Sequence, residues 1–197
     1  MKPALIAVAA FIGFIVLLGL SYIGVYNGLV TKQEAVNSAW AQVQNVYQRR
    51  LDLVPNLVET VKGAANFEKS TLTAVTDARS RVGSFVVDKS IINDPEQFKK
   101  FEAAQGELGR ALSHLMAVSE NYPQLRATEN FRDLQVQLEG TENRIAVERR
   151  TFNEVVQVYN TAIRIMPASI IAGMSGFKEH TYFQADAEAA KAPQVKF

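Results

Sequence analysis

Apolar residues follow two different patterns along this chain, and the change between them divides it into two parts. Between Lys2 and Lys32 no residue is charged, and residues 4–26 are nearly all apolar. At ~1.5 Å per residue this stretch would form a helix about 34 Å long, which matches a hydrocarbon core of roughly 30 Å. A helix at the surface of a soluble core would carry a polar stripe, and this segment has none. We therefore predict a transmembrane helix within residues 1–30.

A cleaved signal peptide is the main alternative for the same segment. Gly19-Leu20-Ser21 is a small-x-small tripeptide, which would allow cleavage before Tyr22. However, the apolar run exceeds the usual ~7–15-residue signal core and continues past this site to Tyr26. We therefore expect the helix to be kept as a single-pass signal anchor. Tyr26, at its end, suits the headgroup level and is the predicted interfacial anchor.

From residue 31 onward, apolar residues recur at steps of three and four, which is the spacing of helices in a bundle. Pro55 lies inside the first stripe and is expected to bend it locally. Asp94 and Pro95 are a typical cap and first residue of the third helix. The four stripes are Val36, Trp40, Val43, Tyr47, Arg50, Val54, Leu57 and Val61; Leu72, Val75, Ala78 and Val82; Phe98, Phe101, Gln105, Leu108, Leu112, Leu115, Ser119 and Tyr122; and Phe131, Leu134, Leu138, Thr141, Ile145, Glu148, Phe152, Val155, Tyr159, Ala162 and Met166.

Four helical stripes with short links predict an all-α fold, in which residues 31–166 form an antiparallel four-helix bundle. If the first helix leaves the membrane and the fourth returns beside it, positions 50 and 148 fall level. Arg50 and Glu148 carry charge on these stripes, so we predict an ion pair between them, inside the bundle or at its edge. Such a pair would fix the register of the helices more than it would stabilise them. The alternative is that both side chains reach solvent.

The segment 167–197 differs from the bundle because it begins with a short apolar stretch and ends in a polar tail. The apolar stretch, residues 167–177, is too short to span a membrane. The fourth helix should end near the level at which the first one leaves the bilayer. We therefore expect Ile170, Ile171, Met174 and Phe177 to contact the membrane interface or a neighbouring subunit. The alternative is that they pack back onto the base of the bundle.

The charges and residue types of the chain argue against several classes of function without indicating a specific one. Of the 21 Lys and Arg residues, all except Lys2 lie from residue 31 onward, which gives 20 positive charges there against all 20 Asp and Glu residues. This formally neutral part offers no basic surface for nucleic acid. The chain has no cysteine, and neither His114 nor His180 stands in the Glu-x-x-His spacing of a bundle metal site. We expect no cofactor, no metal and no catalytic residues, and a cryptic hydrolase is the third-ranked alternative.

Several motifs resemble those of the LemA family, and together they cover essentially the whole chain. The most specific is Tyr47-Gln-Arg-Arg-Leu-Asp-Leu-Val-Pro-Asn-Leu-Val58. The others are Tyr26-Asn27, Trp40, Thr60-Val-Lys-Gly63, Ala78-Arg79, Tyr122-Pro-Gln-Leu-Arg-Ala127, Glu142-Asn-Arg-Ile145, Arg149-Arg150, Phe152-Asn153, Tyr159-Asn160 and Lys191-Ala-Pro-Gln-Val-Lys-Phe197. The resemblance implies a bacterial inner-membrane protein with an N-terminal anchor and a four-helix bundle domain.

One departure from the family pattern strengthens the anchor prediction. Many relatives carry a lipoprotein-type cysteine where this chain reads Leu20-Ser-Tyr-Ile-Gly24, so the helix itself must hold this chain in the lipid bilayer. Lys2 before the helix favours an extracytoplasmic bundle. Ala9-x-x-x-Gly13 and Gly24-x-x-x-Gly28 have the small-residue spacing of associating helices. We expect a non-enzymatic, homo-oligomeric scaffold or assembly factor at the cell envelope; the second alternative is a binding module for a specific envelope protein.

Overall fold

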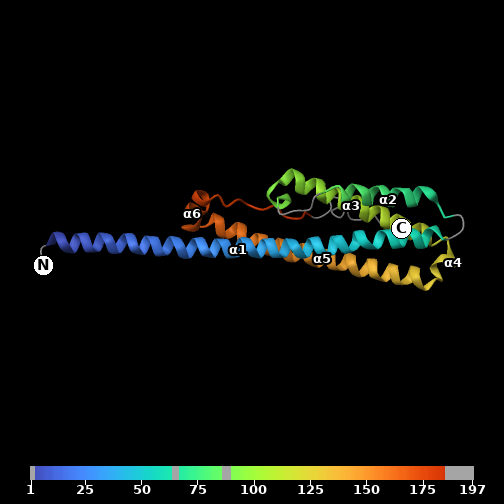
Figure 1. Ribbon diagram of the computed structural model, residues 1–197, viewed down its shortest axis with the longest axis horizontal. Coiled ribbons are helices and arrows are strands. Elements are labelled where there is room, and N and C mark those ends of the chain that lie inside the picture. Colours follow the sequence, from blue (N-terminus) through green and yellow to red (C-terminus); the bar gives the residue numbers. More distant parts are fainter. Residues whose placement is uncertain (1–2, 64–66, 86–89, 185–197) are drawn as a thin grey trace, which may run out of the picture.

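The computed structural model describes residues 3–63, 67–85 and 90–184. Within these residues every regular element is a helix, and there is no strand (Figure 1). The predicted all-α fold class is confirmed. The predicted polar end, residues 186–197, lies outside the described residues. The elements are α1 (Pro3–Lys62), α2 (Lys69–Gly83), the 3-10 helix η1 (Ile91–Asn93), α3 (Pro95–Ser119), α4 (Pro123–Arg126), α5 (Glu129–Arg164) and α6 (Ala168–Ser175).

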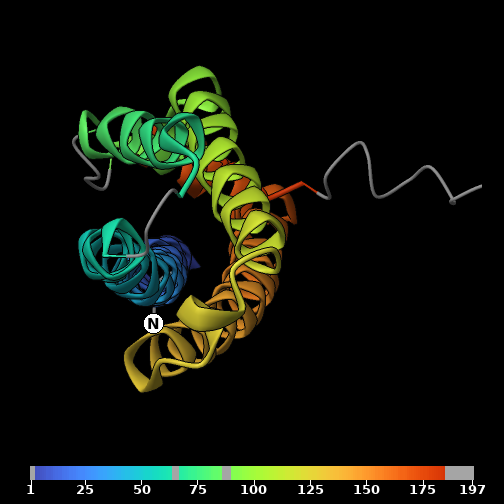
Figure 2. The ribbon, with the colours of Figure 1, turned by 90° about the vertical axis from the view of Figure 1, so that its right-hand side faces the viewer.

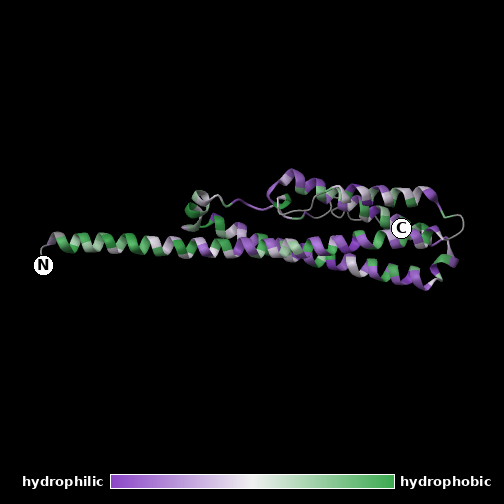
Figure 3. Ribbon diagram, viewed as in Figure 1, coloured by the Kyte–Doolittle hydropathy of each residue, from purple (hydrophilic) through white to green (hydrophobic). Residues whose placement is uncertain are grey.

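Helix α1 is one continuous helix of 60 residues, and at 1.5 Å per residue it is about 90 Å long. The boundary predicted at residue 30 therefore falls inside a helix, and α1 also continues past Pro55. Large apolar side chains are exposed from Leu5 to Ile23, whereas Leu29 is buried. Figure 3 shows this change as a hydrophobic first part of α1 followed by a mixed one.

Among the described residues, α1 is the one helix that is long and apolar enough by itself to cross a membrane. Its most apolar 18-residue window has a mean hydropathy of 2.5, and none of that window is buried inside the protein. Helices α5 and α6 meet the same criterion only if they are taken together, across a bend of 98°. The eight residues of α6 span only about 12 Å, less than half of a hydrocarbon core.

The helices pack in two pairs, α1 with α5 and α2 with α3 (Figures 1 and 2). Helix α5 runs back along α1, because α6, which follows it, contacts α1 at Tyr22, while Glu142 in its middle contacts Arg50. Helix α2 is tied to α1 by a hydrogen bond of 3.2 Å from Arg79 Nε to the Leu51 carbonyl. An ion pair between Arg81 and Glu107 joins α2 to α3.

The predicted stripes describe α1 and α3 well. All eight predicted positions of α1 are buried, as are those of α3 up to Ser119. The expected start of α3 is also confirmed, since Asp94 Oδ1 accepts hydrogen bonds of 2.9 and 3.2 Å from the backbone N–H groups of Glu96 and Gln97. On α2, Val75, Ala78 and Val82 are buried as predicted.

The predicted stripe is incomplete towards the end of α5. Tyr159 and Ala162 are buried as predicted, but Val156, Asn160 and Ile163 are buried although the stripe omitted them. Met166, which is 70% exposed, lies beyond the end of α5. The stripe was drawn with a mean step of about 3.5 residues, but a straight helix has 3.6 residues per turn. The difference turns the buried face by ~20° per heptad, so it moves to neighbouring residues along this long helix.

Candidate functional site

Helix α6 packs against α1 at the level where the exposed apolar part of α1 ends. Tyr22 Oη lies 3.3 Å from Ser175 Oγ. The Tyr26 ring stacks on Tyr22, with centroids 6.2 Å apart, and meets the Phe177 ring edge-on at 5.8 Å. The predicted interfacial anchor, Tyr26, is 38% exposed. We call Tyr22, Tyr26, Ser175 and Phe177 the membrane-proximal cluster.

The four residues predicted to contact a membrane or subunit divide into two groups. Ile171 is buried and Phe177 packs against the same core, so these two residues pack back onto the helical domain, as the alternative held. Ile170 and Met174 point outward and are 54% and 77% exposed. Two further exposed apolar side chains, Ile165 and Met166, stand just before α6. The outward face of α6 and the two residues before it therefore form an exposed apolar surface.

A polar layer divides the core of the helical domain, and Arg50 is at its centre. On α1, residues up to Tyr47 belong to one apolar cluster and residues from Leu53 onward to a second. Arg50, between them, is only 3% exposed. Its Nη1 donates a 2.8 Å hydrogen bond to Glu142 Oε1 on α5, and its Nη2 donates to both the carbonyl oxygen, at 3.1 Å, and the side-chain oxygen of Gln105 on α3. This layer joins three helices.

The predicted partner of Arg50 is wrong. The carboxylate that pairs with Arg50 belongs to Glu142, not to Glu148, which lies six residues further along α5, or about 9 Å of helix rise. A stripe that repeats every three or four residues looks the same after a shift by one or two turns, so it could not decide which acidic residue lies level with Arg50. Arg50 is nevertheless buried and paired inside the domain, so it does not reach solvent as the alternative proposed.

The guanidinium of Arg50 also interacts with the neighbouring Tyr47 side chain. Its Cζ lies 5.2 Å from the centroid of the Tyr47 ring, within the range of a cation–π contact. Burial raises the pKa of the Tyr47 hydroxyl above 10.0, although Arg149 and Arg50 partly oppose this. The phenol is therefore neutral at physiological pH. A Cβ on Gly109 would lie 3.7 Å from Arg50 Nη1, an ordinary van der Waals contact, so α3 passes close to the guanidinium at this position.

After α6, residues 178–184 run as an extended segment along α5, and we call them the C-terminal strap (Figure 1). Two asparagines of α5 each bind both backbone groups of one strap residue. Asn160 Nδ2 donates to the His180 carbonyl at 2.9 Å, and the His180 N–H donates to Asn160 Oδ1 at 3.0 Å. Asn153 forms the same pair of bonds with Phe183, both at 2.9 Å.

The strap side chains fill gaps in the domain. The Phe183 ring lies 4.8 Å from that of Phe98 and 5.5 Å from that of Phe152. The His180 ring packs 4.7 Å from Tyr159, and within the described part of the chain neither ring nitrogen has a hydrogen-bond partner. Burial lowers the pKa of His180 below 6.5, and the nearby Ile92 carbonyl opposes this in part. The imidazole is thus uncharged at neutral pH, which allows its burial.

Sequence reasoning missed the strap, although the sequence carries a signal for it. An aromatic residue followed by asparagine occurs twice at a distance of one heptad, as Phe152-Asn153 and Tyr159-Asn160. Residues seven apart lie on the same face of a helix. A polar amide repeated beside buried aromatic rings indicates a backbone partner, because an amide offers one donor and one acceptor group.

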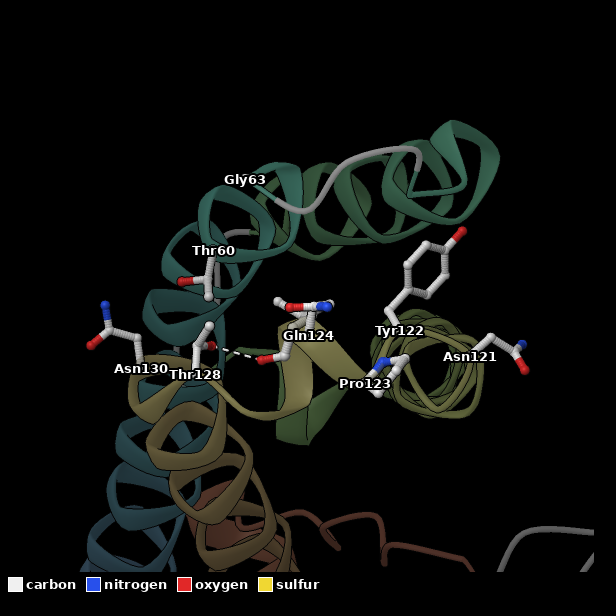
Figure 4. A pocket seen from close by; sticks show the side chains of 9 residues that line it. Thr60, Gly63, Asn121, Tyr122, Pro123, Gln124, Thr128 and Asn130 are labelled. Atoms are coloured by element: carbon white, nitrogen blue, oxygen red, sulfur yellow. Dashed lines mark hydrogen bonds between the residues drawn. The ribbon is translucent and has the colours of Figure 1, made fainter.

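A cavity of about 640 Å³ lies at the end of the domain remote from α6. Figure 4 shows Gln124 between Thr60 and Thr128 on one side and Tyr122 on the other. Thr128 Oγ1 donates to the Leu125 carbonyl at 2.7 Å. The described lining residues supply hydroxyl and amide groups but no carboxylate, histidine or lysine: Thr60, Gly63, Asn121, Tyr122, Pro123, Gln124, Leu125, Thr128 and Asn130. The described lining therefore offers mainly apolar surface with a few neutral polar groups, and no group typical of acid–base chemistry.

Metal binding has no visible basis in residues 3–63, 67–85 and 90–184. They contain no group of three or more His, Asp or Glu side chains that could hold an ion. His180 packs on an aromatic ring, and His114 is exposed on α3.

Comparison with known proteins gives a consistent result. The model of the LemA family matches residues 39–197. Magnetosome protein MamQ of Magnetospirillum gryphiswaldense is 29% identical over 174 residues, which are 80% of this chain and 64% of that protein. Magnetosome protein MamQ 2 of Paramagnetospirillum magneticum is 29% identical over 175 residues, 81% of this chain and 64% of that protein. Protein LemA of Metamycoplasma hominis is 24% identical over 176 residues, 87% of this chain and 76% of that protein. The aligned region thus spans less than two thirds of the two magnetosome proteins.

Proposed function

Because this chain belongs to the LemA family, we propose that it is a membrane-anchored, non-enzymatic protein that associates with itself and acts as a scaffold or assembly factor at the bacterial cell envelope. The first part of α1 spans the inner membrane, and the helical domain, arranged as an antiparallel four-helix bundle, lies on the extracytoplasmic side. The names of the curated relatives, magnetosome protein MamQ and protein LemA, are not those of enzymes.

The observation that carries this proposal is the continuity of α1. The same helix exposes apolar side chains from Leu5 to Ile23 and buries Trp40 completely in the domain core. A continuous helix transmits orientation, because a sharp kink in it requires the disruption of backbone hydrogen bonds. A domain attached in this way is held at a fixed angle to the bilayer, as a scaffold requires, rather than on a flexible tether.

The membrane-proximal cluster supports the same arrangement. Tyrosine rings are favoured at the level of the lipid headgroups, and Tyr22 and Tyr26 lie on α1 beside α6. A short helix with an apolar outward face can lie in the interface plane of a bilayer. With Tyr22 and Tyr26 at the headgroup level, Ile170 and Met174 of α6 enter the interfacial region. The bilayer is then a partner of α6 as well as of α1.

Self-association is supported by the surface that α1 leaves free. A Cβ placed on Gly13, Gly24 or Gly28 would meet no atom within 4 Å among the described residues. The backbone of α1 is accessible at these glycines, so a second helix can approach it closely in a bilayer.

The contact between α6 and the bilayer can be tested with a single introduced thiol, because the chain has no cysteine. We expect a polarity-sensitive dye on Met174→Cys to be quenched severalfold by shallow brominated lipids when the full chain is reconstituted in vesicles. The matched control is Val136→Cys on α5, a residue that is 68% exposed and far from α6, and its dye should not be quenched. Equal quenching at both positions, or at neither, would contradict the proposed docking of α6.

A second candidate function is a binding module for an envelope partner, and the cavity at the remote end of the domain favours it. This cavity is opposite to the anchor and is lined by neutral hydroxyl and amide groups (Figure 4). Ligand sites combine apolar surface with a few polar groups that fix orientation. The same lining disfavours the third candidate, a hydrolase, because it supplies neither a carboxylate nor a histidine as a general base.

A further inference from the structure

The C-terminal strap is recognised mainly through its backbone. Asn153 and Asn160 each satisfy the N–H and carbonyl groups of one strap residue, at distances between 2.9 and 3.0 Å. Tyr159 Oη donates to the Lys178 carbonyl at 3.0 Å, and Arg149 Nη2 donates to the Gln184 carbonyl at 2.8 Å. These contacts are those of a peptide-binding groove, which provides main-chain hydrogen bonds for affinity and side-chain pockets for specificity.

One side chain gives this groove its specificity. Phe183 is 6% exposed and enters an aromatic pocket formed by Trp40, Phe98 and Phe152. The guanidinium of Arg149 covers the outer face of the ring, with its Cζ 4.7 Å from the ring centroid. Burial of a phenylalanine ring removes a large apolar surface from water and so favours binding. The groove therefore selects an extended peptide with an aromatic residue three positions after the residue that Asn160 binds.

The strap is joined to the rest of the chain by a short link with one glycine. Helix α6 ends at Ser175 and is capped by Gly176, whose φ of 77° lies in the left-handed region that glycine adopts readily. The strap contacts come from α1, α3, α5 and η1, for example Thr181 N–H to the Ile92 carbonyl at 3.4 Å, rather than from α6. Within the described residues, release of the strap therefore needs a backbone change around residues 176–178. Three extended residues reach about 10 Å, the distance between packed helices.

We propose that the α5 groove also accepts residues 178–184 of a second copy of this chain, so that neighbouring copies exchange their straps. The identical segment of a second copy makes the same hydrogen bonds and fills the same aromatic pocket, so exchange costs little once two copies meet. Anchoring in one bilayer keeps copies close and raises their effective concentration. This inference rests on the proposed self-association and adds a second contact between copies to the helix contact at the α1 glycines.

Two singly substituted full-length chains with different tags test the exchange when they are produced together. Gln157→Cys places a thiol on α5 and Tyr182→Cys places one on the strap, and both residues line one surface hollow. A short thiol–thiol cross-linker added to the membranes should give a heterodimer that carries both tags. Pairing Tyr182→Cys with Val136→Cys, elsewhere on α5, should give severalfold less.

The chain that carries both substitutions provides the matched control, because its cross-link within one molecule shows that the strap is docked and the variants are folded. If the extracted protein is oligomeric by mass but only this internal cross-link forms, exchange is wrong and the scaffold proposal stands. If the protein is a monomer, both proposals fail. A heterodimer yield equal to that of the Val136→Cys pair would reflect random collision and would also overturn the exchange.

Discussion

Replacement of Trp40 by alanine is expected to destabilise the helical domain by about 4 kcal/mol, the largest loss among single substitutions considered for this chain. Trp40 is fully buried, and its ring centroid lies 5.6 Å from that of Phe101 and 5.5 Å from that of Phe152. It also contacts Phe183 of the strap, at 6.2 Å. The substitution would therefore empty the place where three helices and the strap meet.

Urea unfolding of the detergent-solubilised full chain, followed by circular dichroism, measures this effect without depending on tryptophan fluorescence. Trp40→Phe keeps most of the aromatic contacts and should cost less than half as much. Tyr182→Ala, at a residue that is 38% exposed, should change the free energy of unfolding by less than about 1 kcal/mol. Similar losses for Trp40→Ala and Tyr182→Ala would show that the aromatic cluster is not the centre of the core.

Replacement of Arg50 by alanine is expected to cost about 3 kcal/mol. The side chain of Arg50 is 4% exposed, so its removal leaves a cavity and takes the donor from the buried Gln105 side chain. The Glu142 side chain is 46% exposed and can turn to water, which keeps the loss below that of a fully buried pair.

The matched variant is Glu142→Gln, which keeps a neutral acceptor for Arg50 and should cost about 1 kcal/mol in the same unfolding experiment. The order of the two effects matters more than their size. If Glu142→Gln were as destabilising as Arg50→Ala, the charge of the ion pair would be the main contribution. The result expected here assigns the larger part to the burial of Arg50 and to its bonds with Gln105.

Periodicity predicted the parts of the fold that depend on the direction of side chains around a helix. Two buried stripes, from Val36 to Val61 and from Phe98 to Ser119, could be predicted directly from the sequence. Their residues recur with the period of a helix, so they lie on the one face that packs into the core. The cap at Asp94 was equally readable, since its chemistry is local.

The sequence could not predict how far one helix is shifted along another. Arg50 pairs with Glu142 instead of Glu148 because a repeating stripe fits several registers, and only the full packing of three helices selects one. The continuity of α1 was missed for a different reason. A change from lipid-facing to core-facing residues suggests a boundary, although the backbone hydrogen bonds of a helix do not depend on which solvent its side chains face.

The strap was missed because its recognition is non-local. Residues 178–184 have no helical period, and their hydrogen bonds go to side chains such as Asn153, 30 residues away. The apolar segment divides in two because a short amphipathic helix has two faces, so one alternative could not describe all four of its predicted contact residues. Ile171 of α6 faces the core, while Met174 faces outward.

The mass of the full chain, extracted in mild detergent and measured in lipid nanodiscs, tests the central claim most directly. The account predicts a multiple of the 21.8 kDa chain mass that persists on dilution and falls when Gly24 and Gly28 are both replaced by leucine. A mass of one chain, with no other protein bound to it, would contradict the proposal that this helical protein is a self-associating scaffold.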